Sequence, residues 1–277
     1  MNNINEYIVR SDSGNSYFKI VPSAGGLITN VSILGEEVLF FDRELFLSSF
    51  GEGEVDILSG GIPVLFPVAG SVRYSRYEIE DKEYPMLQHG FARFMEWDVV
   101  SQFGDSIVIR LSSNEYSKRY YPFDFEVEYT AKITDERLSL SWKYINKGDS
   151  EMIYSLGIHP FFMIDKEKGV IIFDVPGDKV YDYNQRKHLP VREKIVFYRV
   201  IDYVYDADRT NYGFDNLKFE VSDDFKTMVL WSPLSKEYLC MEPWTSKPYA
   251  FNSKETVKVL ESENKATSRI DIMWENN

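Results

Sequence analysis

The chain has 277 residues, of which 44% are hydrophobic and 27% charged, and its formal net charge is −13. This balance is typical of a globular protein, and the negative charge argues against a nucleic-acid partner because no basic run offsets it. No apolar run approaches the roughly 20 residues that cross a bilayer, and the N-terminal residues lack the basic and apolar regions of a signal peptide. The sequence therefore predicts a cytoplasmic protein with no membrane partner. Its single cysteine, Cys240, suits a reducing compartment.

Alternation of apolar and polar residues with a period of two dominates the chain and predicts short β-strands. In chain order, the predicted strands cover residues 7–10, 17–21, 106–111, 123–129, 138–144 and 227–231. Turn residues separate them, and no long stretch has clean helical periodicity. No repeat, low-complexity tract or linker divides the chain. We therefore predict an all-β fold, one large antiparallel β-sandwich with long loops that spans residues 1–277 as a single domain.

Two further segments add to this prediction: one lacks the alternation, and the other is a strand near the C-terminus. Residues 60–67 contain two prolines, which lack ladder donors, so this segment is predicted to be a buried, irregular loop. Long ordered loops on a rigid sheet are where functional sites tend to be built. Residues 268–274 alternate again and are predicted to close the edge of a sheet.

Glu242 is the first candidate for chemistry. It lies between Met241 and Pro243, and the neighbouring Trp244 adds a flat apolar surface that a ligand could contact. Apolar neighbours partly desolvate a carboxyl group, which raises its pKa and makes it a better base. For an isolated glutamate at the end of a strand, a solvated or ion-paired carboxylate is the more common interpretation.

Two of the three histidines have similar surroundings. His159 precedes Pro160 and follows Gly157 by two residues, which predicts an imidazole at a strand terminus, and His89 precedes Gly90. A histidine in an apolar strand is more often a satisfied core residue, so the structural interpretation stays open for both. The third histidine, His188, lies in a polar run and is predicted to be solvated. A carboxylate and two imidazoles are nonetheless suited to acid/base chemistry near neutral pH.

Other catalytic patterns are missing from the sequence. There is no CxxC or HExxH pattern for zinc and no G-x-S-x-G context for a nucleophilic serine. We therefore predict neither a metal site nor a cofactor.

The order of these segments resembles the aldose 1-epimerase (mutarotase) family, with its galactose mutarotase-like fold, and in particular the family's shorter bacterial branch. The resemblance runs from about Ser59 to Trp244 and rests on residues 60–67, the run from His89 to Arg93, and Glu242-Pro243-Trp244. It implies an isomerase that interconverts the α and β anomers of an aldose, with a small sugar as its partner and no metal or cofactor. Monomer and homodimer both stay open.

The resemblance also implies roles for individual residues. The late glutamate, Glu242, matches the catalytic base, and the histidine of the His159-Pro160 pair matches the catalytic acid. His89, of a His-Gly pair, matches a sugar-binding histidine. The remaining expected sugar contacts are Arg73 (with Arg76 as the runner-up), Arg93 (for which a surface ion pair is the alternative), Asp215 (with Asp206 and Asp208 as rivals), Trp244 and Phe161.

Two alternatives remain at this stage. One is a hexose-6-phosphate 1-epimerase, in which Arg73, Arg76 and Arg93 would supply the cationic cluster that a phosphate prefers. The other is a non-catalytic carbohydrate-binding protein on the same sandwich, because a fold does not determine a function.

Overall fold

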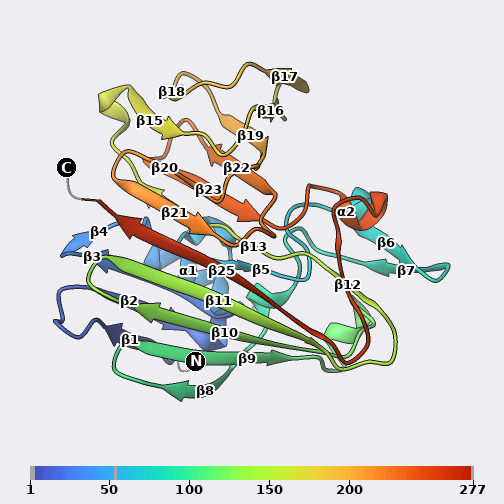
Figure 1. Cartoon of the computed structure of the whole chain (residues 1–277). Helices are drawn as coiled ribbons and strands as arrows, with labels where there is room; N and C mark the ends of the chain where they lie inside the picture. The colour runs from blue at the N-terminus through green and yellow to red at the C-terminus, as the bar shows by residue number, and fades with distance from the viewer. Residues whose placement is uncertain (1–3, 53–54, 276–277) are drawn as a thin grey trace.

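The alternating segments form strands, and the strands assemble into two large antiparallel sheets that share one apolar core (Figure 1). The computed structural model describes residues 4–52 and 55–275. Across the larger sheet the strands are β18 (Lys194–Val196), β15 (Val170–Asp174), β20 (Asn211–Phe214), β21 (Leu217–Val221), β25 (Lys265–Trp274), β11 (Arg137–Asn146), β10 (Phe125–Ile133), β9 (Ser106–Ser112) and β8 (Asp98–Gln102).

The second large sheet carries the candidate site. Across it the strands are β17 (Lys187–Leu189), β16 (Lys179–Asp182), β19 (Ile201–Asp206), β22 (Thr227–Ser232), β23 (Tyr238–Trp244), β13 (Gly157–Ile158) and β5 (Val64–Leu65), and β14 (Phe161–Met163) also pairs with β23. Every strand pairing in the two sheets is antiparallel, which confirms the predicted fold class.

Smaller elements surround these sheets. A four-stranded sheet holds β1 (Tyr7–Arg10), β2 (Tyr17–Val21), β3 (Leu27–Ile33) and β4 (Glu36–Glu37), and two further pairs are β6 (Arg76–Ile79) with β7 (Lys82–Pro85) and β12 (Met152–Tyr154) with β24 (Lys258–Leu260). The described helices are α1 (Arg43–Gly51), α2 (Ala250–Ser253) and the 3-10 turns η1 (Pro22–Ala24), η2 (Ile57–Ser59), η3 (Arg73–Ser75), η4 (Ala92–Phe94), η5 (Ser117–Arg119) and η6 (Lys166–Lys168). The β6–β7 hairpin projects away from the two large sheets (Figure 1). Within residues 4–52 and 55–275, no helix is long and apolar enough to span a bilayer.

The predicted strands all form, with their ends shifted by a few residues, but one predicted position is wrong. Strand β25 does not close an edge: it pairs with β21 on one side and with β11 on the other, inside the nine-stranded sheet. Alternation identifies a strand but not its neighbours, because pairing depends on segments far away in the chain. Helix α1 is also missing from the sequence-based prediction. It begins at an Asp42 cap, whose side chain accepts the Leu45 N–H at 3.0 Å.

Aromatic side chains fill much of the core between the sheets. Tyr129 of β10 and Trp142 of β11 are opposite each other in the register, and their rings stack at 4.9 Å. Phe66, in the irregular segment 60–67, is also a core residue that stacks on Tyr144. The prediction of a buried, irregular segment is confirmed, since only Val64–Leu65 of it form a strand.

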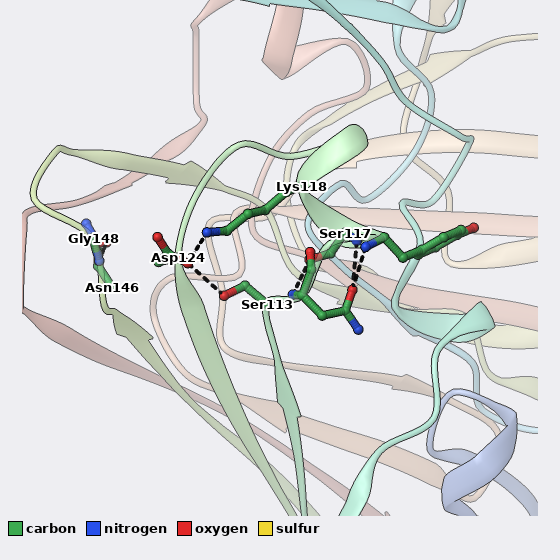
Figure 2. Close-up of polar contacts among 8 residues, drawn as sticks. Ser113, Ser117, Lys118, Asp124, Asn146 and Gly148 are labelled. Atoms are coloured by element: carbon green, nitrogen blue, oxygen red, sulfur yellow. Dashed lines mark hydrogen bonds and ion pairs between the residues drawn. The ribbon is translucent and has the colours of Figure 1, made fainter.

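A loop at one end of the nine-stranded sheet is fixed by side-chain contacts (Figure 2). Between β9 and β10, Asp124 accepts a hydrogen bond from Ser113 at 3.2 Å and pairs with Lys118 at 2.7 Å. In the turn that follows β11, Asn146 accepts the Gly148 N–H at 3.0 Å. These contacts satisfy turn backbone and order that end of the sheet.

Strand β23 is buried on both faces, and its two faces have different neighbours. Leu239 and Met241 belong to the main core, whereas Cys240 and Trp244 belong to two smaller apolar clusters. Successive side chains of a strand point to opposite faces, so Glu242 shares the second face with Cys240 and Trp244. The carboxyl group therefore lies on the sheet face that is turned away from the main core.

Candidate active site

Glu242 and His159 meet on that second face of β23. Gly157 pairs with Trp244, and Phe161 pairs with Cys240, so the residue midway between them, His159, lies across from Glu242. His159 Nε2 is 3.3 Å from Glu242 Oε1, and the two residues are 7% and 1% exposed. His159 Nδ1 and Glu242 Oε2 have no hydrogen-bond partner in the described protein. Buried polar atoms normally have partners, so this pair is suited to receive a polar ligand.

The surroundings of His159 orient its ring. The imidazole stacks on Phe161 at 4.7 Å, and the His159 backbone N–H donates to the carbonyl of Pro63 at 3.1 Å. Gly157 is required by close packing, because a Cβ at that position would lie 2.5 Å from Trp244 Cδ1. Phe161 is fully buried beneath the imidazole, so it supports His159 rather than forming an outer wall.

His89 reaches the same site from a tight loop. Its backbone has a left-handed φ of 64°, and its N–H donates to the Gly70 carbonyl at 2.7 Å. The Gly70 N–H donates in turn to His89 Nδ1 at 3.2 Å, so Nε2 carries the hydrogen when the ring is neutral. The ring centroid lies 5.5 Å from that of His159 and 5.7 Å from that of Trp244. The structure thus brings together His89, His159, Glu242 and Trp244.

Burial governs the protonation of these groups. Burial lowers the pKa of His159 well below its usual value and that of His89 to about 3, with the Arg93 charge contributing to both. Burial raises the pKa of Glu242 well above its usual value; the nearby Asp202 carboxylate adds to this increase and the Trp244 indole N–H opposes it. The low-dielectric surroundings thus favour a neutral imidazole and a protonated carboxyl group. This differs from the protonated His159 that the resemblance implies for a catalytic acid.

Asp202 is a site residue that the sequence analysis missed. In the register, Cys240 of β23 pairs with Trp231 of β22, and Trp231 pairs with Asp202 of β19, so Asp202 shares the face of Glu242. Burial, with a smaller contribution from Asp182, raises the pKa of Asp202 to about 6. An acidic residue inside the alternating segment 201–206 was a usable signal. The sequence could not show that this strand lies two strands away from β23.

The structure separates the two proposed arginines. Arg93 is half-buried: its Nη1 donates to the Val55 carbonyl at 2.7 Å, and its charge lowers the pKa of both site histidines. Arg73 lies exposed in turn η3, where its backbone N–H donates to Asn252, and the runner-up Arg76 pairs with Glu83 at 3.1 Å on the β6–β7 hairpin. Of the three, Arg93 is the one whose charge acts on the site.

Asp215 is not brought to this cluster. It occupies the turn between β20 and β21, and its side chain accepts the Ile172 N–H at 3.1 Å, beside a different pocket. Its rival Asp206 is closer to the site: Asp206 pairs with Thr227 of β22, and Thr227 pairs with Trp244. The Asp206 carboxylate also forms an ion pair with Lys247 at 2.6 Å.

Cys240 adds a thiol to the site. Ligand atoms of Cys240, His159 and Glu242 all lie within 4.8 Å of one another, a spacing that a metal ion could bridge. A metal requires the thiolate, but burial and the neighbouring Glu242 raise the pKa of the Cys240 thiol well above its usual value. The residues therefore fit a metal poorly, and we assign none.

Comparison with known proteins identifies relatives of this chain. The family described as "Aldose 1-epimerase" matches residues 53–258. Protein LacX (chromosomal) of Lactococcus lactis subsp. lactis is 22% identical to the chain, and the alignment covers 89% of this chain and 93% of LacX. Among solved structures, the Slr1438 protein from Synechocystis sp. PCC 6803 superposes with a TM-score of 0.92 at 28% identity, covering 100% of this chain and 97% of its own. A galactose mutarotase related enzyme from Lactobacillus acidophilus gives a TM-score of 0.78 at 21% identity, with 98% of each chain covered. This last likeness confirms the predicted galactose mutarotase-like fold.

Proposed function

Because the chain belongs to the aldose 1-epimerase family, we propose that it catalyses the interconversion of the α and β anomers of an aldose, with Glu242 and His159 as the acid/base pair. One observation carries the proposal: a carboxyl group and an imidazole lie 3.3 Å apart and buried, beside His89 and Trp244. Simple sugar binding requires aromatic and neutral polar groups rather than a buried, paired acid and base. This arrangement therefore favours catalysis over a purely binding role.

The proposed reaction opens and closes the sugar ring. On opening, a base removes the proton from the C1 hydroxyl while an acid delivers a proton to the ring oxygen, and the C1–ring oxygen bond breaks. The open aldehyde rotates about its C1–C2 bond. On closure the two groups exchange roles, and the enzyme returns to its initial state. One proton shared between one base and one acid suffices.

The resemblance assigns the base to Glu242 and the acid to His159, which requires the shared proton on His159 at the moment of ring opening. Burial by itself favours that proton on Glu242, since it lowers the pKa of His159 and raises that of Glu242. Hydroxyl groups of a bound sugar would hydrogen-bond the charged forms and so stabilise the ion pair that burial alone opposes. Substrate binding would thereby create the reactive protonation state.

Further residues are proposed to hold the sugar. His89 Nε2 lies 3.2 Å from the Gln88 side-chain amide, so this imidazole and amide together would bond a sugar hydroxyl, and Trp244 contributes an aromatic surface beside the imidazole. Asp202 lies on the same sheet face and would accept hydroxyl hydrogens, and Arg93 would favour a developing negative charge.

Polarimetry on freshly dissolved α-D-glucose and α-D-galactose tests the proposal. The wild type should accelerate the decay of optical rotation, and Glu242→Gln and His159→Asn should each reduce the enzymatic rate by about 10²–10⁴. Glu220→Gln removes an exposed carboxylate and is the matched control, with an unchanged rate. Near-normal activity in either site variant would show that the pair does not perform the chemistry.

The same assay with glucose 6-phosphate tests the phosphorylated alternative. Acceleration of that sugar alone would move the proposal to a hexose-6-phosphate 1-epimerase. The positions of the arginines do not favour it, because Arg76 pairs with Glu83 on the hairpin whereas Arg93 bonds Val55 beside the site. Binding of sugars without acceleration of any would instead support a non-catalytic carbohydrate-binding protein.

A further inference from the structure

A pocket opens on the sheet face that carries Glu242. It has a volume of about 390 Å³, which is within the usual range of small-molecule sites. Its floor comes from β16 and β19, toward the edge of the eight-stranded sheet, and its far wall comes from residues 247–249. Tyr181, Tyr183, His188 and Tyr249 give it an aromatic lining.

The pocket lies in line with the candidate active site across the sheet. Glu242 pairs with Val229, Val229 with Val204, and Val204 with Tyr181, which makes one row of side chains across four neighbouring strands. Val204 both lines the pocket and packs against the apolar cluster that contains Val229 and Trp244. One end of this row is therefore Glu242, and the other end is Tyr181 in the lining of the pocket.

Residues 247–249, which form the far wall of the pocket, are close to the candidate active site in the chain. Residues 247–249 follow β23 closely, and Lys247 Nζ pairs with Asp206 Oδ1 at 2.6 Å, which fixes this segment against the sheet. On the other side, Asp202 lies near enough to Tyr183 to contribute to the raised pKa of that phenol. Asp202 therefore stands between Glu242 and the aromatic lining.

The chemistry of the lining fits a neutral sugar ring. Tyr181 lies 5.1 Å from Tyr183 and 5.2 Å from His188, ring centroid to ring centroid, and each tyrosine is only partly buried. A tyrosine offers a flat apolar face for the C–H groups of a pyranose and a phenol for its hydroxyls. Of the two lysines of the pocket, Lys247 is neutralised by its ion pair with Asp206, which is also opposite Lys179 in the strand register.

The distance between Tyr181 and Glu242 indicates how long the bound sugar must be. Three strand spacings separate the backbone of Tyr181 from that of Glu242, which is about 14 Å. An aldose held by its C1 hydroxyl at Glu242 is too short to place its own ring against Tyr181. A sugar unit joined to that aldose by a glycosidic bond continues along the row of side chains toward the pocket.

We propose that this pocket binds the second sugar unit of a reducing disaccharide or longer oligosaccharide, whose reducing-end aldose occupies the site of Glu242 and His159. The inference rests on the proposed function and specifies its substrate class. Maltose, cellobiose and lactose are suitable probes, because each presents a free anomeric carbon on a reducing glucose. Maltose has an α-1,4 linkage, cellobiose and lactose have a β-1,4 linkage, and the second ring of lactose is galactose.

The kinetic test compares kcat/KM for mutarotation of the three disaccharides with that for glucose and galactose. We expect at least one disaccharide to exceed its monosaccharide by tenfold or more. Tyr181→Ala should remove about tenfold from that disaccharide alone and leave the monosaccharides unchanged. Tyr198→Ala, at a tyrosine that is 71% exposed and does not line this pocket, is the control and should change neither. Equal constants for disaccharides and monosaccharides, or an equal loss for both in Tyr181→Ala, would overturn the proposal.

A binding measurement separates this inference from the proposed function. Saturation-transfer NMR with Glu242→Gln reports ring contacts without turnover. We expect signals from the non-reducing ring of a disaccharide that disappear when Tyr181→Ala is added. If the wild type accelerates no sugar, the proposed function fails, yet such signals would still support the pocket. Absence of contact from the non-reducing ring of all three disaccharides, or binding of glucose 6-phosphate in their place, would refute the pocket assignment.

Discussion

Glu242→Gln should stabilise the protein while it removes activity. Glu242 is 1% exposed, and burial raises the pKa of its carboxyl group well above the usual 4.5. Above pH 4.5 the unfolded chain therefore releases this proton while the folded protein keeps it, so the folded state binds more protons. Stability consequently falls as the pH rises toward the raised pKa. Glutamine has the same shape and no titration, so the variant escapes this loss.

The size of the effect is bounded by linkage. One proton per molecule changes the free energy of unfolding by at most about 1.4 kcal/mol per pH unit. Between pH 5 and 8 the advantage of Glu242→Gln should therefore increase with pH by at most about 4 kcal/mol, and we expect an increase of more than about 1 kcal/mol. The lowered pKa values of His89 and His159 give the opposite dependence, a loss of stability as the pH falls below 6.5, so the difference between the two proteins is decided by its change above pH 6.5.

Urea unfolding at four pH values from 5 to 8, followed by tryptophan fluorescence, measures the difference. Glu220→Gln is the control, because an exposed carboxylate should change stability by less than about 0.5 kcal/mol at every pH. A difference between the wild type and Glu242→Gln that stays flat, or that decreases with pH, would refute the view that burial favours the protonated form of Glu242 in the folded protein. It would then be an ordinary ionised carboxylate.

Three further outcomes follow from the structure. Asp202→Asn removes a charge that raises the pKa of Glu242, so the limb of the pH–rate profile governed by Glu242 should move to lower pH; an unmoved limb would separate the two groups. In urea unfolding, Gly90→Ala should lower the unfolding free energy by about 3 kcal/mol or more, because its Cβ would lie 2.2 Å from the Phe66 carbonyl oxygen. Gly14 has a similar left-handed φ but open space around it, so Gly14→Ala is the control and should cost about 1 kcal/mol. Trp142→Ala should cost about 3–5 kcal/mol, and a much smaller loss would mean that its stacking neighbour refills the space.

The sequence by itself determined the fold class and the centre of the candidate site. Period-two alternation is a property of each strand alone, so the strands around Tyr129, Trp142 and Met228 could be predicted without knowledge of their partners. The apolar flanks of Glu242 and the Gly and Pro neighbours of His159 are equally local, and they mark a desolvated carboxyl group and an imidazole at a strand end. These features could be predicted from the sequence because each depends only on residues next to it in the chain.

Only the tertiary structure decided what depends on pairing and register. Alternation shows which side chains of one strand share a face, but it does not show which strands are neighbours. For this reason residues 268–274 were predicted at an edge and lie inside the sheet, and Asp215 was predicted near the sugar although Asp202 shares the face of Glu242. The same limit applies to Arg93, whose charge reaches the histidines through the folding of the loop that follows His89. The aromatic pocket beyond Val204 lies in line with Glu242 only because four strands align their side chains in one row.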